Sequence, residues 1–196
     1  MKTAAIVLPL LLLGCTAKPD ARDTALPPAT PQSTVGASSD ADSARAFVQR
    51  FYDWYLATGA RDGHPYDSLL TSRRAWLGDS LATAFAADVA MQRADTVAEI
   101  ASLSAEADVF LNSQDPCAHY RAQAPRIGPG GAYAVVVAGD CGNLSAQPNL
   151  EVHVRNGGSG WRVENITDPT DSTFRLVQAL IRYRADQDSA GRGGQP

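Results

Sequence analysis

The chain has little of several features that would assign it to a class of protein at once. It contains no apolar run near the roughly 20 residues that a membrane-spanning helix needs. Its formal charge is −4, so it lacks the basic excess that is typical of nucleic-acid-binding surfaces. It also lacks a glycine-rich phosphate loop, a G-x-S-x-G motif and an H-E-x-x-H motif. We therefore expect no nucleic-acid partner, and no motif identifies a cofactor or a reaction.

The composition is nevertheless that of a folded protein. Of the 196 residues, 44% are hydrophobic and 19% are charged, which excludes disorder of the whole chain. The length fits one ordinary domain with additional segments, and no internal repeat is visible.

Residues 1–14 have the pattern of an export signal. Lys2 precedes an unbroken apolar run at 4–13, which suits a signal peptide and is too short to span a membrane. The end of this run and the two residues after it (12–15) read LLGC, which resembles the lipobox of bacterial lipoproteins. The resemblance implies cleavage before Cys15 and lipid attachment to its thiol, which would anchor the chain to a membrane. Thr16 follows in place of Asp, which by resemblance to Gram-negative lipoprotein sorting implies the outer membrane, on its periplasmic side. The alternative is an ordinary signal peptide that contains a cysteine by chance.

The segments that flank the expected domain are poor in apolar residues. After the cysteine, the rest of the segment 15–42 contains four prolines and no aromatic residue, and it is predicted to be a disordered linker. The glycine-rich segment 189–196 is predicted to be a flexible tail. The folded domain is therefore expected at 43–188.

Hydrophobic periodicity within this domain changes from helical to alternating near Asp115. Apolar residues at helical spacing predict helices at 43–58, 66–71 and from 79 onward, the last extending with a break to Leu103, and a final helix that starts at 168–170. Alternation predicts strands at 119–124, 133–138, 150–155 and 161–166, with a glycine-rich turn before the last. Helices followed by an antiparallel sheet and a C-terminal helix predict an α+β fold.

This order of elements resembles the nuclear-transport-factor-like (cystatin-like) cone fold, in which N-terminal helices pack on a curved antiparallel sheet. Residues 47–56 (FVQRFYDWYL) look like the first helix of the YbjP-type lipoproteins, a family of bacterial envelope domains. Residues 108–115 (DVFLNSQD) look like the family's D-P-F-x-x-x-Q-D segment, with Val109 in place of the proline. Residues 161–166 (WRVENI) match its closing W-x-I-x-x-I strand. The resemblance implies a cone fold and an envelope location, and it implies no established chemistry.

Two cysteines remain when Cys15 carries lipid. In an oxidising periplasm, Cys117 and Cys141 are expected to form a disulfide, because they lie at the same end of two strands that would pair antiparallel. The alternative is a metal site made of both cysteines with His119 and His153, although this spacing matches no zinc module closely. No metal or other cofactor is predicted. His153 alternates with two valines, so it is expected to point to solvent together with Glu151 and Arg155.

Polar residues inside the mouth of a cone fold could perform acid–base chemistry. The candidate pocket residues of this kind are Tyr52, Tyr55, Asp108, Gln114, Asp115 and Tyr133. A structural role is favoured for them, because tyrosines at helical spacing usually belong to the core and the segment 114–116 has the pattern of a turn. None is assigned as catalytic.

We therefore expect a lipid-anchored envelope protein that binds another envelope protein or a small ligand and is not an enzyme. The alternatives are an enzyme of the cone fold that uses Asp and Tyr, and a lipoprotein that acts as an immunity protein or inhibitor. The enzyme hypothesis requires that Asp115 and at least two tyrosines line one water-accessible cavity.

Overall fold

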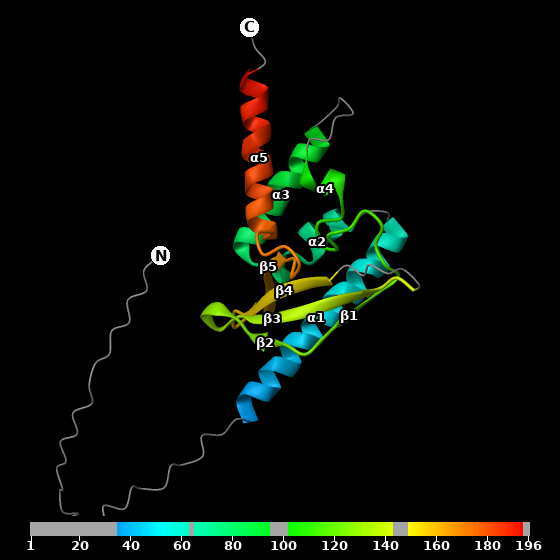
Figure 1. Ribbon diagram of the computed structural model, residues 1–196, viewed down its shortest axis with the longest axis vertical. Coiled ribbons are helices and arrows are strands. Elements are labelled where there is room, and N and C mark those ends of the chain that lie inside the picture. Colours follow the sequence, from blue (N-terminus) through cyan, green and yellow to red (C-terminus); the bar gives the residue numbers. More distant parts are fainter. Residues whose placement is uncertain (1–34, 63–64, 95–101, 143–148, 194–196) are drawn as a thin grey trace, which may run out of the picture. The chain divides into compact units, whose positions relative to one another are not determined.

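The computed structural model describes residues 35–62, 65–94, 102–142 and 149–193 (Figure 1). The predicted signal peptide, Cys15 and most of the predicted linker lie outside the described residues. The helical elements are α1 (Val35–Asp62), α2 (Tyr66–Ser72), α3 (Asp79–Ala94), α4 (Leu103–Glu106) and α5 (Leu176–Gly193), with short 3-10 turns at Arg74–Trp76 and Pro129–Gly131. The strands are β1 (His119–Ala122), β2 (Arg126–Ile127), β3 (Tyr133–Asp140), β4 (Asn149–Asn156) and β5 (Trp161–Thr167).

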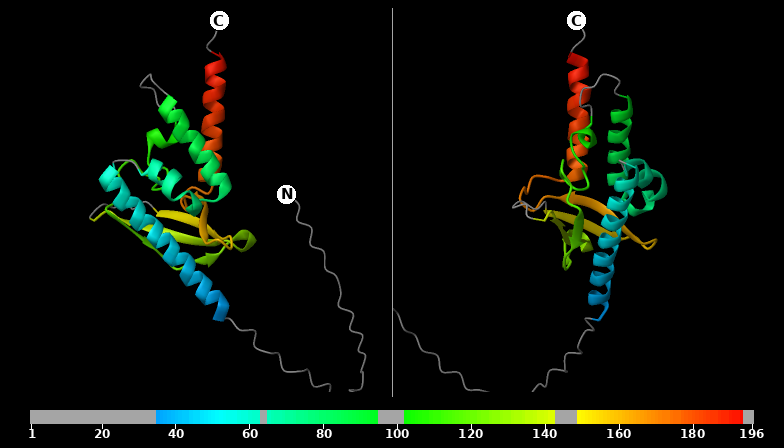
Figure 2. Two further views of the ribbon diagram at one scale, coloured as in Figure 1. Left: turned by 180° about the vertical axis from the view of Figure 1, so that it is seen from behind. Right: turned by 90° about the vertical axis from the view of Figure 1, so that its right-hand side faces the viewer.

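All strands belong to one antiparallel sheet in the order β1-β3-β4-β5, and the short β2 pairs with β3 beside β1. Because side chains alternate along a strand, the register places Val135 of β3 and Val152 of β4 on the same face, where both are fully buried. Helix α1 crosses this face (Figure 2), while α5 packs against α3 and β5. The α+β fold is confirmed.

The core between α1 and the sheet is aromatic. The predicted apolar stripe of α1 faces inward, since Phe47, Val48, Phe51, Tyr52 and Tyr55 are each at most 3% exposed. These residues recur at intervals of three and four, which places them on one side of a helix. Because that side contacts β1, β3 and β4, α1 fixes where the polar ends of its tyrosines meet the rest of the chain.

Several predicted element boundaries were wrong. Helix α1 already includes 35–42, where a linker was predicted; this stretch has no proline to break a helix, and the last one upstream is Pro31. It also continues past Gly59, which therefore does not end it. Helix α5 starts at Leu176, because the side chains of Asp168 and Asp171 accept hydrogen bonds from nearby backbone N–H groups and hold 168–174 in turns. It continues to Gly193, into the predicted tail.

The helix predicted from 79 to Leu103 is divided. Helix α3 ends at Ala94, residues 95–101 lie outside the described residues, and α4 starts anew where Ser102 accepts a hydrogen bond from the N–H of Ala105 (3.2 Å). Within the ranges that the structure describes, no helix has both the length and the apolar character to cross a membrane.

Candidate functional site

The most polar part of the core lies where α1 meets the turn 108–113. The hydroxyl of Tyr55 donates to both carboxylate oxygens of Asp108, at 2.8 and 2.9 Å. The same carboxylate accepts the backbone N–H groups of Phe110 (3.0 Å) and Leu111 (3.1 Å). Asp108 therefore shapes its own turn and ties that turn to α1. This is the pattern by which an aspartate satisfies local backbone donors.

Two further tyrosines are bonded nearby. Tyr52 donates to the carbonyl of Phe110 (3.0 Å), and Tyr66 of α2 donates to the carbonyl of Ser104 (3.5 Å). Burial raises the pKa of Tyr52, Tyr55 and Tyr66 well above the usual tyrosine value, and the negative charge of Asp108 raises all three further. These hydroxyls therefore remain protonated donors at neutral pH and are poorly suited to act as general bases.

A pocket of about 310 Å³ opens beside Tyr55 and Asp108. Its remaining wall is largely apolar and is formed by Leu56, Gly59, Ala60, Pro65, Leu111, Pro116, Cys117 and Ala118. A second hollow, of about 610 Å³, shares Leu56, Ala60 and Ala118 with it and continues between α1 and β1. We call the two hollows together the α1–β1 groove. It combines apolar walls with few polar groups, which is the usual character of a binding site.

The other candidate residues lie apart from this site. Gln114 and Asp115 are exposed, and the amide of Gln114 donates to the carbonyl of Glu106 (3.3 Å). Neither residue lines the pocket. Tyr133 lies at the opposite end of β3, where its ring packs against Trp161 with centroids 5.7 Å apart. The structure thus brings together Tyr52, Tyr55 and Asp108, and it does not place Asp115 with two tyrosines in one cavity.

The two cysteines of the domain meet at the edge of the pocket. Cys117 and Cys141 lie at disulfide-bonding distance with Cα atoms 4.5 Å apart, at the shared end of the antiparallel pair β1 and β3. A Cβ atom on Gly139 would come within 2.6 Å of the Cys117 sulfur, so the pair requires glycine there. Among the described ranges, no three His, Cys, Asp or Glu side chains are placed to hold a metal ion, and the histidines of the alternative metal site do not join the cysteines.

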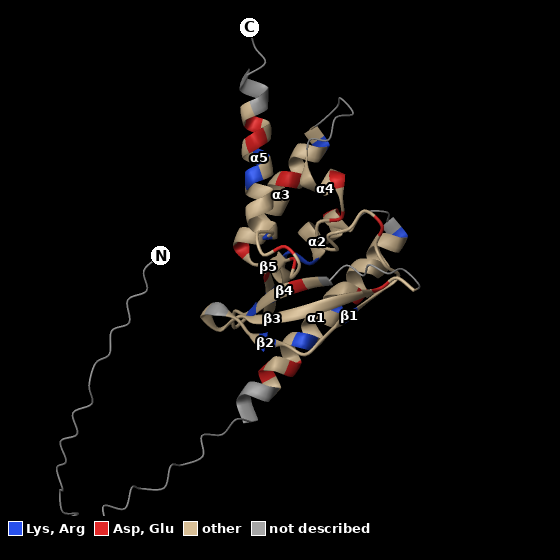
Figure 3. Cartoon of the chain, viewed as in Figure 1, with Lys and Arg blue, Asp and Glu red and all other residues tan. Residues whose placement is uncertain are grey.

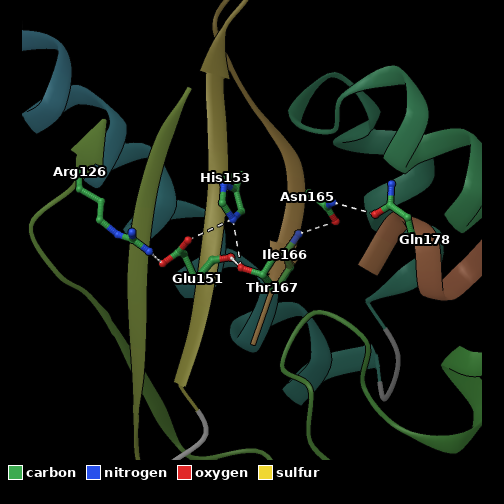
Figure 4. A network of polar contacts seen from close by, with 7 residues as sticks. All are labelled: Arg126, Glu151, His153, Asn165, Ile166, Thr167 and Gln178. Atoms are coloured by element: carbon green, nitrogen blue, oxygen red, sulfur yellow. Dashed lines mark hydrogen bonds and ion pairs between the residues drawn. The ribbon is translucent and has the colours of Figure 1, made fainter. Parts of the chain in front are cut away.

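The expected orientation of Glu151 and His153 to solvent was wrong. Glu151 is only 7% exposed, and its carboxylate forms an ion pair with Arg126 of β2 and lies 3.2 Å from the imidazole of His153 (Figure 4). His153 also contacts the hydroxyl of Thr167 (3.1 Å). Burial lowers the pKa of His153, and the positive charges of Arg175 and Arg126 lower it further. Alternation along β4 gave the correct face, but side chains from β2 and β5 cover it.

Sequence reasoning also missed Gln49. Its side chain donates to the carbonyl of Tyr120 (3.0 Å) and to a carboxylate oxygen of Asp53 (2.8 Å), and it accepts the N–H of Ala122 (2.9 Å). Gln49 lies beside the buried stripe of α1, where a glutamine ordinarily faces solvent. No feature of the local sequence distinguishes it from the other polar residues of the helix.

The fold and the site together define an α+β domain with an open antiparallel sheet and an apolar groove between its first helix and its edge strand. No protein family, no curated protein and no solved structure matches the chain.

Proposed function

We propose that this chain is a lipid-anchored envelope protein, facing the periplasm from the outer membrane, and that its domain is a non-enzymatic binding module. The α1–β1 groove would hold the ligand or the partner. The N-terminal pattern around Cys15 supports the anchor. The pairing of Cys117 and Cys141 at bonding distance supports an oxidising compartment, since disulfides persist there.

One observation carries the binding role. The polar groups beside the pocket already hold the fold together: Tyr55 and two backbone N–H groups bond to Asp108, and Tyr52 bonds to the turn that Asp108 shapes. A catalytic pair needs a nucleophile or base that is free to reach substrate. The pocket offers a fixed, mostly apolar surface, which suits recognition better than proton transfer.

We also propose that the domain is a cystatin-like cone of the YbjP type. Helix α1 covers one face of the antiparallel sheet, and the segment 108–115 forms a turn ahead of β1. In the closing strand β5, Val163 and Ile166 are fully buried, as expected for the apolar positions of a W-x-I-x-x-I strand. These features support the family assignment without depending on the lipid anchor.

Anchoring is tested by lipid labelling in a Gram-negative host. Cells that express the chain are fed an alkyne analogue of palmitate, and membranes are then separated on a density gradient. We expect a labelled protein in the outer-membrane fraction. Cys15→Ser should lose the label and appear in the soluble periplasmic fraction. A labelled or membrane-bound Cys15→Ser protein would show that the anchor lies elsewhere.

Binding at the groove is tested by photo-crosslinking in intact envelopes. A benzophenone amino acid replaces Ala60, which is exposed and lines both hollows, and in a matched control it replaces the exposed Ser172. We expect an adduct of defined mass at position 60 and none at position 172. Equal or absent crosslinking at both positions would refute a binding role for the groove.

A further inference from the structure

Within the described residues, the outer edge of strand β1 is bonded by a side chain and by no further strand. β1 ends the sheet and pairs with β3 on its inner side. The N–H of Gln123 donates to the carbonyl of Val136 in β3 (2.8 Å), so the backbone groups of residue 123 face β3. In an antiparallel pair, alternate residues direct their backbone groups to the partner strand, so residues 120 and 122 direct theirs outward.

Gln49 bonds two of these outward groups. Its Nε2 donates to the carbonyl of Tyr120, and its Oε1 accepts the N–H of Ala122. These partners fix the orientation of the amide, since a carbonyl accepts and an N–H donates. A residue in a parallel strand makes this same pair of bonds, to the residues before and after its neighbour. The Gln49 amide thus takes the place of one residue of a strand parallel to β1.

The space for such a strand lies beside the amide. Gln49 borders the larger hollow of the α1–β1 groove, and it also borders a further hollow of about 300 Å³ that lies next to Ala122. Helix α1 lines this space from Arg45 to Ala60. At 1.5 Å per residue, that length is about 22 Å, which corresponds to roughly six or seven residues of extended chain.

The two ends of this space carry opposite charge. Arg45 and Arg50 line the end beside Ala122, on the half of α1 where Figure 3 shows both basic and acidic residues. Asp53 and Asp108 line the part that leads toward Cys117. A strand parallel to β1 would run from the acidic end to the arginines, so its C-terminal carboxylate would lie beside two guanidinium groups. Arg121 also borders the larger hollow, but its side chain alternates along β1 with that of the buried Tyr120 and therefore extends away from the core side of the strand.

We propose that the α1–β1 groove binds the extended C-terminal segment of a partner polypeptide, which adds to β1 as a parallel strand and displaces the amide of Gln49. Main-chain hydrogen bonds to β1 would supply affinity, and the two arginines would select a free carboxylate. This inference rests on the binding role proposed above for the groove, and it names the class of partner.

The test uses peptides of defined chemistry on the exported Cys15→Ser protein. A library of random hexapeptides with free C-termini is displayed and selected, and the best binder is synthesised with a fluorophore at its N-terminus. Affinity is then measured by fluorescence polarisation. Four matched peptides follow: one with an amidated C-terminus, and three in which successive backbone nitrogens are methylated one at a time.

Strand addition makes a specific pattern of results. Methylation should weaken binding at least tenfold at alternate residues and little between them, because only alternate N–H groups face β1. Amidation should weaken binding in the parent protein and have no further effect in the Arg45→Gln/Arg50→Gln variant.

Gln49→Ala should bind about threefold tighter or better, since no amide must be displaced. Ala122→Pro should lose binding, because it removes an outward N–H that the ladder to β3 does not use.

Two outcomes would overturn the inference. One is a library that yields no binder. The other is a binder whose affinity depends on neither the methylated position nor the carboxylate; it would occupy the groove by side chains alone. The methylated peptides are tested on the protein with an unaltered domain. The conclusion about strand addition therefore does not depend on whether the Ala122→Pro protein folds. If position 60 crosslinks to a small molecule and the library yields no peptide, the groove is a binding site, but its ligand is not a peptide.

Discussion

The three buried tyrosines near Asp108 predict that the domain loses stability steeply above pH 10. Tyr52, Tyr55 and Tyr66 are at most 5% exposed, and each has a pKa raised above that of a free tyrosine. In the unfolded chain, the three hydroxyls lose their protons near pH 10, while the folded domain retains them. The folded state then binds more protons than the unfolded state, so the free energy of unfolding falls as the pH rises through and beyond 10.

The size of the effect follows from the number of groups. Each hydroxyl contributes about 1.4 kcal/mol per pH unit above 10, so the three together contribute about 4 kcal/mol per pH unit. A domain has roughly 5–15 kcal/mol in total, and about 8 kcal/mol is lost by pH 12, so a domain with a stability at the lower end of this range is expected to unfold between pH 11 and 12. Lysine does not obscure this signal, because Lys2 and Lys18 are the only lysines and both precede the described residues.

The assay is urea unfolding followed by circular dichroism at intervals from pH 8 to 11.5. Tyrosine ionisation is recorded in parallel from absorbance near 295 nm in the folded and unfolded protein. Tyr55→Phe should reduce the slope by about 1.4 kcal/mol per pH unit, and at neutral pH it should lower stability by about 1.5–3 kcal/mol through loss of the bond to Asp108. A free energy of unfolding that stays constant from pH 9 to 11 would refute the reasoning.

Three further predictions concern other parts of the fold. Phe51→Ala should cost about 3–5 kcal/mol, measured by urea unfolding, because the ring is fully buried against Tyr52, Tyr55, Trp76 and Phe110; a loss under 1 kcal/mol would contradict this. Protein purified without reductant should show Cys117 and Cys141 joined in non-reducing peptide mass analysis, and two free thiols would disprove the bond. NMR titration should give His153 a pKa below 6.5, and Arg126→Gln should raise it; an unchanged value would exclude the influence of this arginine.

The elements that could be predicted from the sequence are those whose side chains repeat with a period. The stripe from Phe47 to Tyr55 and the alternation in β4 follow from burial of one side of a helix and one face of a strand, and both were found. Helix ends were predicted less well, because a single glycine such as Gly59 costs only about 1 kcal/mol in a helix, which packing offsets.

The site was predicted only in part, because its contacts join residues that are far apart in the sequence. Tyr55 and Asp108 were both candidates, but their contact joins residues 53 positions apart, and no local pattern encodes that distance. Glu151 was misplaced because its partner Arg126 belongs to a strand of two residues, which is too short to show a period. Gln49 was missed because its bonds to β1 depend on where α1 crosses the sheet edge.

The turn that Asp108 holds has a consequence for how a ligand would meet the pocket. Tyr55 and two backbone N–H groups fix this wall through bonds that exist before any ligand arrives. Ligand binding therefore need not order the turn, and the entropy that a mobile wall would lose on association has already been lost during folding. At this part of the groove, selectivity then depends on shape, because the wall beside Tyr55 and Asp108 is already formed when the ligand arrives.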